Sequence, residues 1–387
     1  METKDKFSLI SIVIPALNEE NVVGKTLKSI DVENLKKLGL DTEIILVDND
    51  SIDNTAKEAR QTGARVVYEK NHGYGNAYLR GFKEAKGDII VMGDADGTYP
   101  LDEISEFIQP ILKNNVDFII GSRLKGNIQK GAMPWLHRYV GNPILTSIMN
   151  FLFKLNISDA HCGMRAITKE ALQKMNLQTT GMEFATEMIV EAARRDLRIT
   201  EIPIEYKPRK NSKAKLASFR DGWRHLRFML IYSPDYLYLF PGLLFTGFGF
   251  FLMVLLLIQP IKVGVISLSM HPMAIGSLFT LLGTQILLTW MNVKYYAVSG
   301  GYIKKSRMIS FMCRHFTLER AILIGVTLIG IGTALGILIV RKWYLAHYRA
   351  LDEMKMVVLL VTLMVIGSQI VFSSFFLSVL RIKRKGK

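Results

Sequence analysis

The stretch Ile89-Ile90-Val91-Met92-Gly93-Asp94-Ala95-Asp96 decides the fold of this chain of 387 residues. Its four consecutive apolar side chains predict a strand that is covered on both faces, since a strand with one wet face would alternate with polar residues. Two carboxylates follow directly where that strand ends. Ligands of helix-covered parallel sheets bind beyond the carboxyl ends of the strands, so we expect the functional site at this edge.

Segments of the same kind precede and follow this strand. Amphipathic stretches at 21–30 and 54–61, and a third up to residue 85, predict helices. This alternation predicts an α/β fold with a mostly parallel sheet that helices cover on both faces. The further predicted strands are the short apolar runs at 9–14, 43–47, 64–68 and 117–120.

The chain after residue 236 has the composition of a membrane domain. Four apolar segments there each have about the 20 residues that a helix needs to cross roughly 30 Å of hydrocarbon. We expect a catalytic domain over 1–210, a linker over 211–236 and a membrane domain over 237–387. The four predicted transmembrane helices lie at about 237–258, 272–292, 320–340 and 356–380.

The linker combines basic residues with apolar ones. Lys213, Lys215, Arg220 and Arg224 alternate with side chains such as Trp223. This pattern predicts a basic amphipathic helix that lies on the membrane surface. An ordinary linker helix with a solvated face is the alternative interpretation.

The net charge of +15, from 49 basic and 34 acidic residues, is compatible with nucleic acid or with an anionic membrane as partner. The basic clusters flank apolar segments, so we expect the lipid bilayer and no nucleic acid. The connector between the second and third segments and the C-terminal tail are the most basic loops. We therefore expect them, and the N-terminal domain, on the cytoplasmic side.

Polar residues also end two other predicted strands. Asp48-Asn49-Asp50 follows the second strand, and Pro15-Ala16-Leu17-Asn18-Glu19 ends the first. Gly75 and Asn76 belong to a glycine-containing turn before a helix, whose backbone amides could approach a nucleotide. Carboxylates spaced like Asp94 and Asp96 can hold one hard cation. Turn formation and helix capping are the alternative roles of these residue types.

In their order and spacing these motifs resemble glycosyltransferase family 2. The segments Gly121-Ser122-Arg123 and 159–165 narrow the resemblance to the polyprenyl-phosphate glycosyltransferases, the group of the dolichyl-phosphate mannose and glucose synthases. The resemblance covers residues 8 to about 233 and implies a GT-A, Rossmann-like fold, and group members with four following membrane helices are known. The chain departs from the pattern at Asp48-Asn49, where two acids are frequent, and after Asp96, where Gly97-Thr98 replaces Leu-Gln. The G-x-S-K signature that is usual in this group is also altered, and residues 211–215 stand in its place.

The resemblance implies transfer of a hexose, with inversion, from GDP-mannose or UDP-glucose to a polyprenyl or dolichyl phosphate at the cytoplasmic face of a membrane. UDP-N-acetylhexosamines remain open as donors. A prokaryotic plasma membrane is favoured over the endoplasmic reticulum. The implied contacts with the nucleotide sugar come from Pro15, Leu17, Asn18, Glu19, Asp48, Asn49, Asp50, Gly75, Asn76, Asp94, Ala95, Asp96 and Arg209.

The resemblance also implies roles in catalysis. Asp94 and Asp96 would hold Mg²⁺ or Mn²⁺ against the donor diphosphate, with a ribose contact as the alternative for Asp94. Arg209 would add a direct cation there. Arg123 and Arg138 would bind the acceptor phosphate, because guanidinium groups bind phosphate bidentately. For Arg138 a solvated surface position is the alternative.

Two other functions fit parts of the pattern. A processive polysaccharide synthase shares the sheet and the membrane helices, but the Q-x-x-R-W motif typical of such enzymes is absent from the sequence. A lipid-binding or flippase-like membrane protein with a nucleotide-sensing domain is the other alternative.

Overall fold

The computed structural model describes residues 7–209, 218–259, 261–263, 266–300, 303, 307–349 and 351–381. The chain forms two compact units, residues 1–229 and 230–387, which are described separately below. The basic motif at 211–215, the N-terminal residues 1–6 and the basic tail after residue 381 lie outside the described residues.

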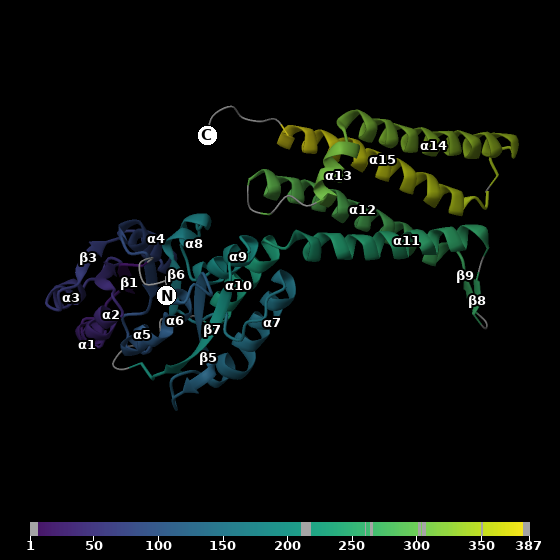
Figure 1. Ribbon diagram of the computed structural model, residues 1–387. Helices are drawn as coiled ribbons and strands as arrows, with labels where there is room; N and C mark the ends of the chain where they lie inside the picture. The colour runs from purple at the N-terminus through teal and green to yellow at the C-terminus, as the bar shows by residue number, and fades with distance from the viewer. Residues whose placement is uncertain are drawn as a thin grey trace. The chain divides into compact units, whose positions relative to one another are not determined.

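The first unit is built on a seven-stranded sheet in the order β3-β2-β1-β4-β6-β5-β7 (Figure 1). β1 pairs in parallel with both β2 and β4, and β2 pairs in parallel with β3. The predicted mostly parallel sheet is therefore confirmed. The strands are β1 (Leu9–Ala16), β2 (Asp41–Asp48), β3 (Arg65–Tyr68), β4 (Ile89–Met92), β5 (Phe118–Ile128), β6 (Arg165–Thr168) and β7 (Ile199–Tyr206).

Two strands, β6 and β7, have no counterpart among the predicted ones. β6 runs antiparallel to both β4 and β5, between which it lies. β5 continues to Ile128 instead of ending at residue 120, with a register shift between Ser122 and Asn127 in its pairing with β7. Such an irregularity bends a strand and re-aims its side chains.

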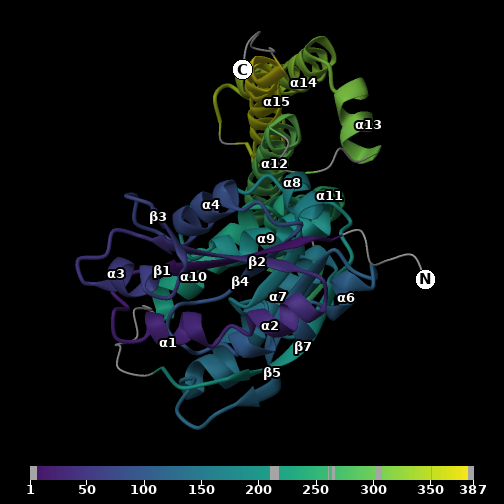
Figure 2. The same ribbon diagram turned by 60° about the vertical axis from the view of Figure 1, so that its left-hand side comes forward.

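Helices cover both faces of the sheet, as predicted (Figure 2). Because the chain steps outward from β1 to β3 and then returns to β4, right-handed connections put α4 on the face opposite to α1, α2 and α3. The helices of this unit are α1 (Val23–Lys28), α2 (Val32–Lys37), α3 (Thr55–Arg60), α4 (Tyr74–Glu84), α5 (Ile104–Phe107), α6 (Gln109–Leu112), α7 (Asn142–Phe153), α8 (Lys169–Lys174), α9 (Phe184–Arg194) and α10 (Ser218–Ile231).

Helix α10 covers part of the linker predicted over 211–236. His225, Phe228 and Met229 on α10 are buried, and Met229 belongs to the core of the first unit. Trp223 and Ile231 remain exposed. The helix therefore has one side that packs inside the first unit and a second, exposed side.

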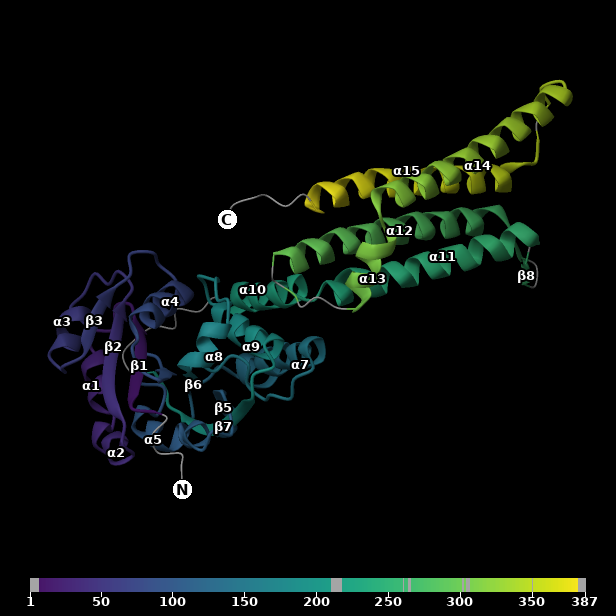
Figure 3. The ribbon, with the colours of Figure 1, turned by 45° about the horizontal axis from the view of Figure 1, so that its top comes forward.

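Among the described residues of the second unit, four helices are long and apolar enough to cross a membrane: Asp235–Ile258, Met270–Ser299, Leu318–Leu345 and Met354–Arg381. Each of the four predicted segments lies within one of these candidate spans, which is longer than the segment. The elements are a short π-helix η3 (Asp235–Leu239), α11 (Phe240–Ile258), a hairpin of β8 (Ile261–Val263) and β9 (Ile266–Leu268), α12 (Met270–Ser299), α13 (Arg307–His315), α14 (Leu318–Leu345) and α15 (Met354–Arg381). Figure 3 shows the long helices α11, α12, α14 and α15 of this unit.

Glycines set the close packing of these long helices. A Cβ on Gly249 of α11 would overlap the backbone of α12, and one on Gly367 of α15 would overlap the backbone of α14 at Gly325. Membrane helices associate through small residues in this way, because lipid offers no hydrophobic drive between them.

A substitution at Gly81 in α4 tests how closely this helix packs on the sheet. A Cβ at Gly81 would collide with Val13 of β1 and Val47 of β2. We expect Gly81→Ala to lower the free energy of unfolding of the first unit by about 1–3 kcal/mol, in spite of the better helix propensity of alanine. Gly24 of α1 has only Glu58 near its Cβ position, at 4.0 Å, so Gly24→Ala is the matched control and should be neutral or stabilising. Equal thermal midpoints of the two variants would contradict this packing.

Candidate active site

Asp94 and Asp96 lie immediately beyond the carboxyl end of β4, as the sequence predicts. Asp96 is buried, and its Oδ1 accepts hydrogen bonds from the backbone amide and the hydroxyl of Thr98, at 3.0 and 2.6 Å. Ala95 between them is buried, and its carbonyl accepts from Thr26 of α1 at 3.0 Å. The turn that carries the two carboxylates is thus tied down on both sides.

Burial and the neighbouring Asp96 raise the pKa of Asp94 to about 7, against the opposing effect of Arg209 and Arg123. The hydroxyl of Tyr74 donates to Asp94 over 3.4 Å. Two carboxylates this close repel each other when both are ionised. The pair therefore favours a cation beside it.

Arg209, just after β7, supplies one such cation in this structure. Its Nε donates to Oδ2 of Asp96 at 2.9 Å, and its Nη2 contacts the same oxygen. The fold thus brings Arg209 to Asp96, although 113 residues separate the two, and the predicted role of Arg209 as a cation on the donor phosphates stays a prediction. The order of the strands brings them to one edge.

The acidic pair also fits a divalent ion. No group of three or more His, Cys, Asp or Glu side chains suited to a metal occurs among the described residues. Two carboxylates suffice for Mg²⁺ or Mn²⁺ when phosphates and water supply the remaining oxygens. The guanidinium on Asp96 shows that a positive charge is accommodated there.

The ends of β1 and β2 lie side by side. Asn18 and Asp50 both have positive φ angles, 51° and 66°, in turns that leave these two strands. The Oδ1 of Asn18 accepts from the amide of Ile52 at 2.9 Å, which links the two turns. Asp48 and Glu19 are buried beside them, whereas Pro15 and Leu17 are partly exposed. Their contacts with a nucleotide sugar stay predictions.

Asn49 has a structural function that the sequence does not reveal. Its amide nitrogen donates to the carbonyls of Glu69 and Asn71, at 3.0 and 2.7 Å, and its oxygen accepts from the amide of Gly73 at 2.8 Å. The side chain therefore holds the loop between β3 and α4. A second acid in its place would lack the donor that this loop requires.

The turn at Gly75 and Asn76 is covered by another segment of the chain. The amide of Asn76 donates to the carbonyl of Thr180 at 3.2 Å, and a Cβ on Gly75 would overlap the backbone of Thr179. Glu187 holds this covering segment by accepting from the amides of Gln178 and Thr179, at 3.0 and 2.9 Å. Close backbone packing thus requires the glycine, and the nucleotide contacts of both residues stay predictions.

Arg123 is buried and forms two parallel hydrogen bonds with Asp159, from Nε at 2.7 Å and from Nη2 at 2.8 Å. Burial alone would raise the pKa of Asp159, but the neighbouring Arg123 holds this pKa below its usual range. The guanidinium also lies over the ring of Tyr206, 5.1 Å from its centroid. The predicted acceptor-binding role of Arg123 stays a prediction.

The segment 159–165 next to Arg123 packs around the acidic pair. Gly163 donates its amide to the Tyr99 hydroxyl at 2.8 Å, and its Cβ position lies 3.1 Å from Oδ2 of Asp94. Arg165 is fully buried and donates to the carbonyls of Ala160, Cys162 and Ala185. Arg165 is therefore a structural residue. Tyr74 and Tyr99 are site residues that the sequence analysis missed, because a single aromatic residue carries no signal of its own.

Arg138 belongs to a different element from those that carry the acidic pair, the short π-helix η2 (His137–Gly141) before α7. It stacks on Tyr139, 5.3 Å from the ring centroid. Large apolar side chains are exposed on η2, α7 and the turn before them, with Trp135 68% exposed. This apolar ridge comprises Trp135, Leu136, Tyr139, Ile144 and Phe151.

Comparisons with known proteins agree with this geometry. Residues 11–175 match the model of "Glycosyl transferase family 2", and residues 291–381 match the "Glycosyltransferase family 2 C-terminal transmembrane region". The chain is 38% identical over 370 residues to the "Low-salt glycan biosynthesis hexosyltransferase Agl6" of Haloferax volcanii, a match that covers 95% of this chain and 88% of that protein. The chain belongs to glycosyltransferase family 2.

Other known proteins match a little more than half of this chain. The "UDP-N-acetylglucosamine--dolichyl-phosphate N-acetylglucosaminyltransferase" of Methanococcus voltae is 34% identical, over 51% of this chain and 85% of that protein. The "Dolichyl-phosphate hexose transferase" of Haloferax volcanii is 31% identical, over 57% of this chain and 92% of that protein. Glucosyl-3-phosphoglycerate synthase from Mycobacterium tuberculosis superposes with a TM-score of 0.47 at 23% identity, over 58% of this chain and 79% of that protein.

Two family models match, and the described residues include four candidate membrane spans. This family 2 glycosyltransferase is therefore a multi-pass membrane protein with an α/β domain built on a mostly parallel sheet. The predicted fold and the predicted family are both confirmed. The donor, the acceptor, the metal and the roles of single residues are taken up below as proposals.

His161, near the site, makes the stability of the first unit depend on pH. Both of its ring nitrogens are buried without a hydrogen-bond partner among the described residues, and its ring contacts His225 at 4.6 Å between centroids. Burial and the neighbouring His225 lower the pKa of His161 to about 3, from 6.5. The unfolded chain therefore binds a proton below pH 6.5 that the folded chain does not.

We expect His161 to lower the free energy of unfolding by about 1.4 kcal/mol for each pH unit from about 6.5 down to 3. His225, whose pKa is lowered to about 4, acts in the same direction, and Asp94, whose pKa is raised to about 7, acts in the opposite direction. Thermal unfolding of the purified protein across pH 7 to 5 measures the slope, and His161→Leu should flatten it. The exposed His72, which contacts Asp50 at 3.2 Å, offers the control His72→Gln, whose slope should match the wild type. A His161→Leu slope as steep as that of the wild type would refute this assignment.

Proposed function

We propose that this protein transfers a hexose, with inversion, from a nucleotide-diphosphate sugar to a polyprenyl or dolichyl phosphate. The observation that carries the proposal is the acidic pair at the end of β4, in which the buried Asp96 is paired with Arg209. A family 2 domain followed by four membrane helices supports a lipid acceptor. So do the names of relatives such as the "Dolichyl-phosphate hexose transferase" of Haloferax volcanii.

The donor would lie across the ends of β1, β2 and β4. Asp48 and Asn18 offer acceptors for the base and ribose, and Glu19 lies beside Arg209. GDP-mannose, UDP-glucose and UDP-N-acetylhexosamines are the candidate donors. The name of the relative from Methanococcus voltae contains UDP-N-acetylglucosamine, which supports UDP-N-acetylhexosamines as candidate donors.

Asp94 and Asp96 would hold the divalent ion, which when bound offsets the negative charge of the donor diphosphate. Asp94 is partly neutral near pH 7 in the metal-free protein, since its pKa is about 7. Arg209 would turn from Asp96 to the donor phosphates, because the planar fork of a guanidinium suits two phosphate oxygens.

The acceptor would need no strong base. A phosphate oxygen is already ionised at neutral pH, so it can attack the anomeric carbon directly. The new bond joins that carbon to the acceptor oxygen while the bond to the donor diphosphate breaks, and the nucleoside diphosphate leaves with the electron pair. The protein's contribution is to hold two anionic groups close together by means of cations.

Arg138 is our candidate for binding the acceptor phosphate. It lies on the apolar ridge, where exposed aromatic side chains suit the boundary of a bilayer, in which a lipid phosphate lies. Arg123 would act from inside the site, where Asp159 already fixes its fork. The positive-inside distribution of charge supports a cytoplasmic active site, and the archaeal relatives support a prokaryotic plasma membrane.

Asp96→Asn tests the catalytic proposal. The amide keeps an oxygen for Thr98 but removes the charge, so we expect sugar transfer to fall at least about hundredfold. The measurement is radiolabel passing from each of several UDP- and GDP-sugars into an extractable lipid, with polyprenyl phosphate and Mg²⁺ or Mn²⁺. Asp102→Asn, at an exposed carboxylate nearby, is the control and should keep full activity. Near-wild-type transfer by Asp96→Asn would refute the role of this carboxylate.

Arg138→Gln tests the acceptor site. We expect the KM for polyprenyl phosphate to rise about tenfold, because one charge-assisted contact is lost, while the KM for the nucleotide sugar stays unchanged. Arg60 on α3 also stacks on a tyrosine, Tyr68, at 5.6 Å, so Arg60→Gln is the matched control and should change neither KM. An unchanged KM for the lipid in Arg138→Gln would remove this arginine from the acceptor site.

A further inference from the structure

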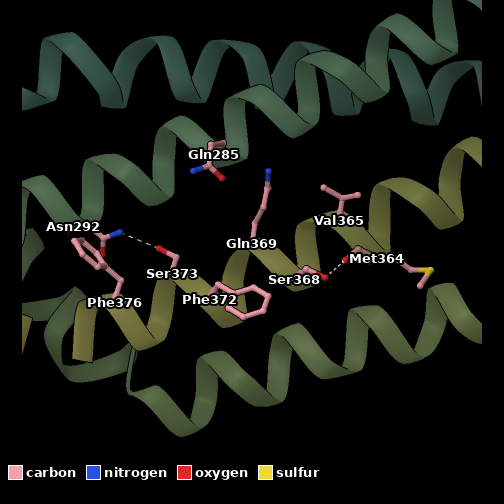
Figure 4. Close-up of a pocket in the computed structure, with 9 residues that line it drawn as sticks. All are labelled: Gln285, Asn292, Met364, Val365, Ser368, Gln369, Phe372, Ser373 and Phe376. Carbon is pink, nitrogen blue, oxygen red and sulfur yellow. Dashed lines mark hydrogen bonds between the residues drawn. The ribbon is translucent and has the colours of Figure 1, made fainter. Parts of the chain in front are cut away.

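The membrane unit contains a groove between α12 and α15 whose walls combine polar and apolar side chains (Figure 4). Its volume is about 470 Å³. Gln285 and Asn292 line it from α12, and Gln369 and Ser373 line it from α15, together with the rings of Phe372 and Phe376. All of these residues belong to helices that are candidate membrane spans.

Some polar side chains here hold the two helices together. The amide nitrogen of Asn292 donates to the hydroxyl of Ser373 at 3.0 Å, and the hydroxyls of Ser277 and Thr362 lie 2.6 Å apart. The contact of Ser277 with Thr362 joins the first halves of α12 and α15, and the contact of Asn292 with Ser373 joins their second halves. The two helices therefore run in parallel, joined by polar contacts of a kind common between membrane helices.

Two amide oxygens in the groove take no part in such contacts. Oδ1 of Asn292 and Oε1 of Gln369 are buried and have no hydrogen-bond partner among the described residues. Gln285 and Gln369 extend from facing helices into the same space (Figure 4). A buried amide oxygen without a donor is unfavourable in any apolar medium, and most of all where water is scarce.

The chemistry of the walls selects the ligand. An acyl or isoprenoid chain has no hydrogen-bond donor to offer these oxygens. An anionic group is disfavoured, because no charged side chain is among the lining residues that the structure describes. Amides beside aromatic rings suit a neutral ligand rich in hydroxyl groups, since amides bind hydroxyls in both directions and rings cover apolar C–H faces.

The groove is reachable from the bilayer. Phe372 is 74% exposed on its side of α15, in the part of the molecule that lipid would surround. Asn292 lies close in sequence to Lys294, which forms an ion pair with Asp235 at 2.5 Å near one end of the spans. Gln285 lies two turns of α12 farther from that end, about 10 Å along the axis. A ligand attached to a lipid could therefore enter sideways.

We propose that this groove binds the sugar group of a polyprenyl-linked saccharide inside the membrane unit. The identity of that ligand as a lipid-linked sugar rests on the proposed function. The groove is a second site, separate from the acidic pair, and it takes the sugar by its hydroxyls.

The experiment measures binding of two synthetic probes to the full chain in lipid nanodiscs, a short isoprenyl-phosphate hexose and the same isoprenyl phosphate without sugar. We expect the sugar-bearing probe to bind at least about tenfold more tightly to the wild type. Gln369→Leu should abolish that difference. Because Oε1 of Gln369 has no hydrogen-bond partner among the described residues, the substitution should not unfold the helix bundle, and circular dichroism checks this.

Thr333→Val on α14 is the matched control, since this exposed hydroxyl donates to the carbonyl of Ile329 in its own helix, at 2.9 Å. It should retain the wild-type preference for the sugar. Equal binding of both probes to the wild type, or an undiminished preference in Gln369→Leu, would overturn the proposal. The proposal would also be overturned if the variant Phe372→Cys formed disulfide-linked dimers and the protein had a dimeric mass, because a second copy of the chain would then occupy the groove.

The probes are supplied ready-made, so this measurement does not depend on transfer by the protein. A failure of the transfer assay would refute the proposed function and leave the preference for the sugar to be measured. A missing preference with intact transfer would refute the groove alone.

Discussion

The loss of solvation at Asp94 and Asp96, together with the repulsion between the two carboxylates, is the constraint on which the site of the first unit depends. A strand end that carries two carboxylates out of bulk water needs positive charge close by, and the pKa of about 7 for Asp94 shows that the need is only partly met. Arg209 provides part of it from the far end of the domain sequence. The sheet order makes this possible, because β4 and β7 end at the same edge.

Other buried charges in the first unit are compensated individually. Arg123 is paired with Asp159, and Arg165 is satisfied by three carbonyl groups. Such fully bonded groups are rigid, since a buried charge without its partner would be unfavourable by several kcal/mol, roughly 3–5. The fixed side chains Arg123 and Arg165 thus lie in the same unit as the contact of Asp96 with Arg209. In that contact, a ligand can take the place of one partner. The same rule holds in the membrane unit, where Lys294 is buried and paired with Asp235.

The sequence analysis predicted the five strands that contain a run of apolar side chains and missed β6 and β7. β4 is buried at all four positions, and β1 nearly so, whereas β7 is mostly half-buried and has the pattern of an irregular polar stretch. β6 is short and begins with the buried Arg165, a residue type that normally argues against a core strand. The membrane spans were predicted because about 20 apolar residues in a row are rare in helices that do not cross a membrane.

Local patterns of hydrophobicity and charge are enough to specify the α/β class, the four spans and the acidic pair at the end of β4, so all three could be predicted from the sequence alone. Which distant groups meet became known only from the folded chain: Arg209 on Asp96, Asn49 inside the β3–α4 loop, and Gln369 opposite Gln285. Such meetings depend on strand order and helix register. Both are set by the packing of the whole chain, so no single stretch of sequence contains them.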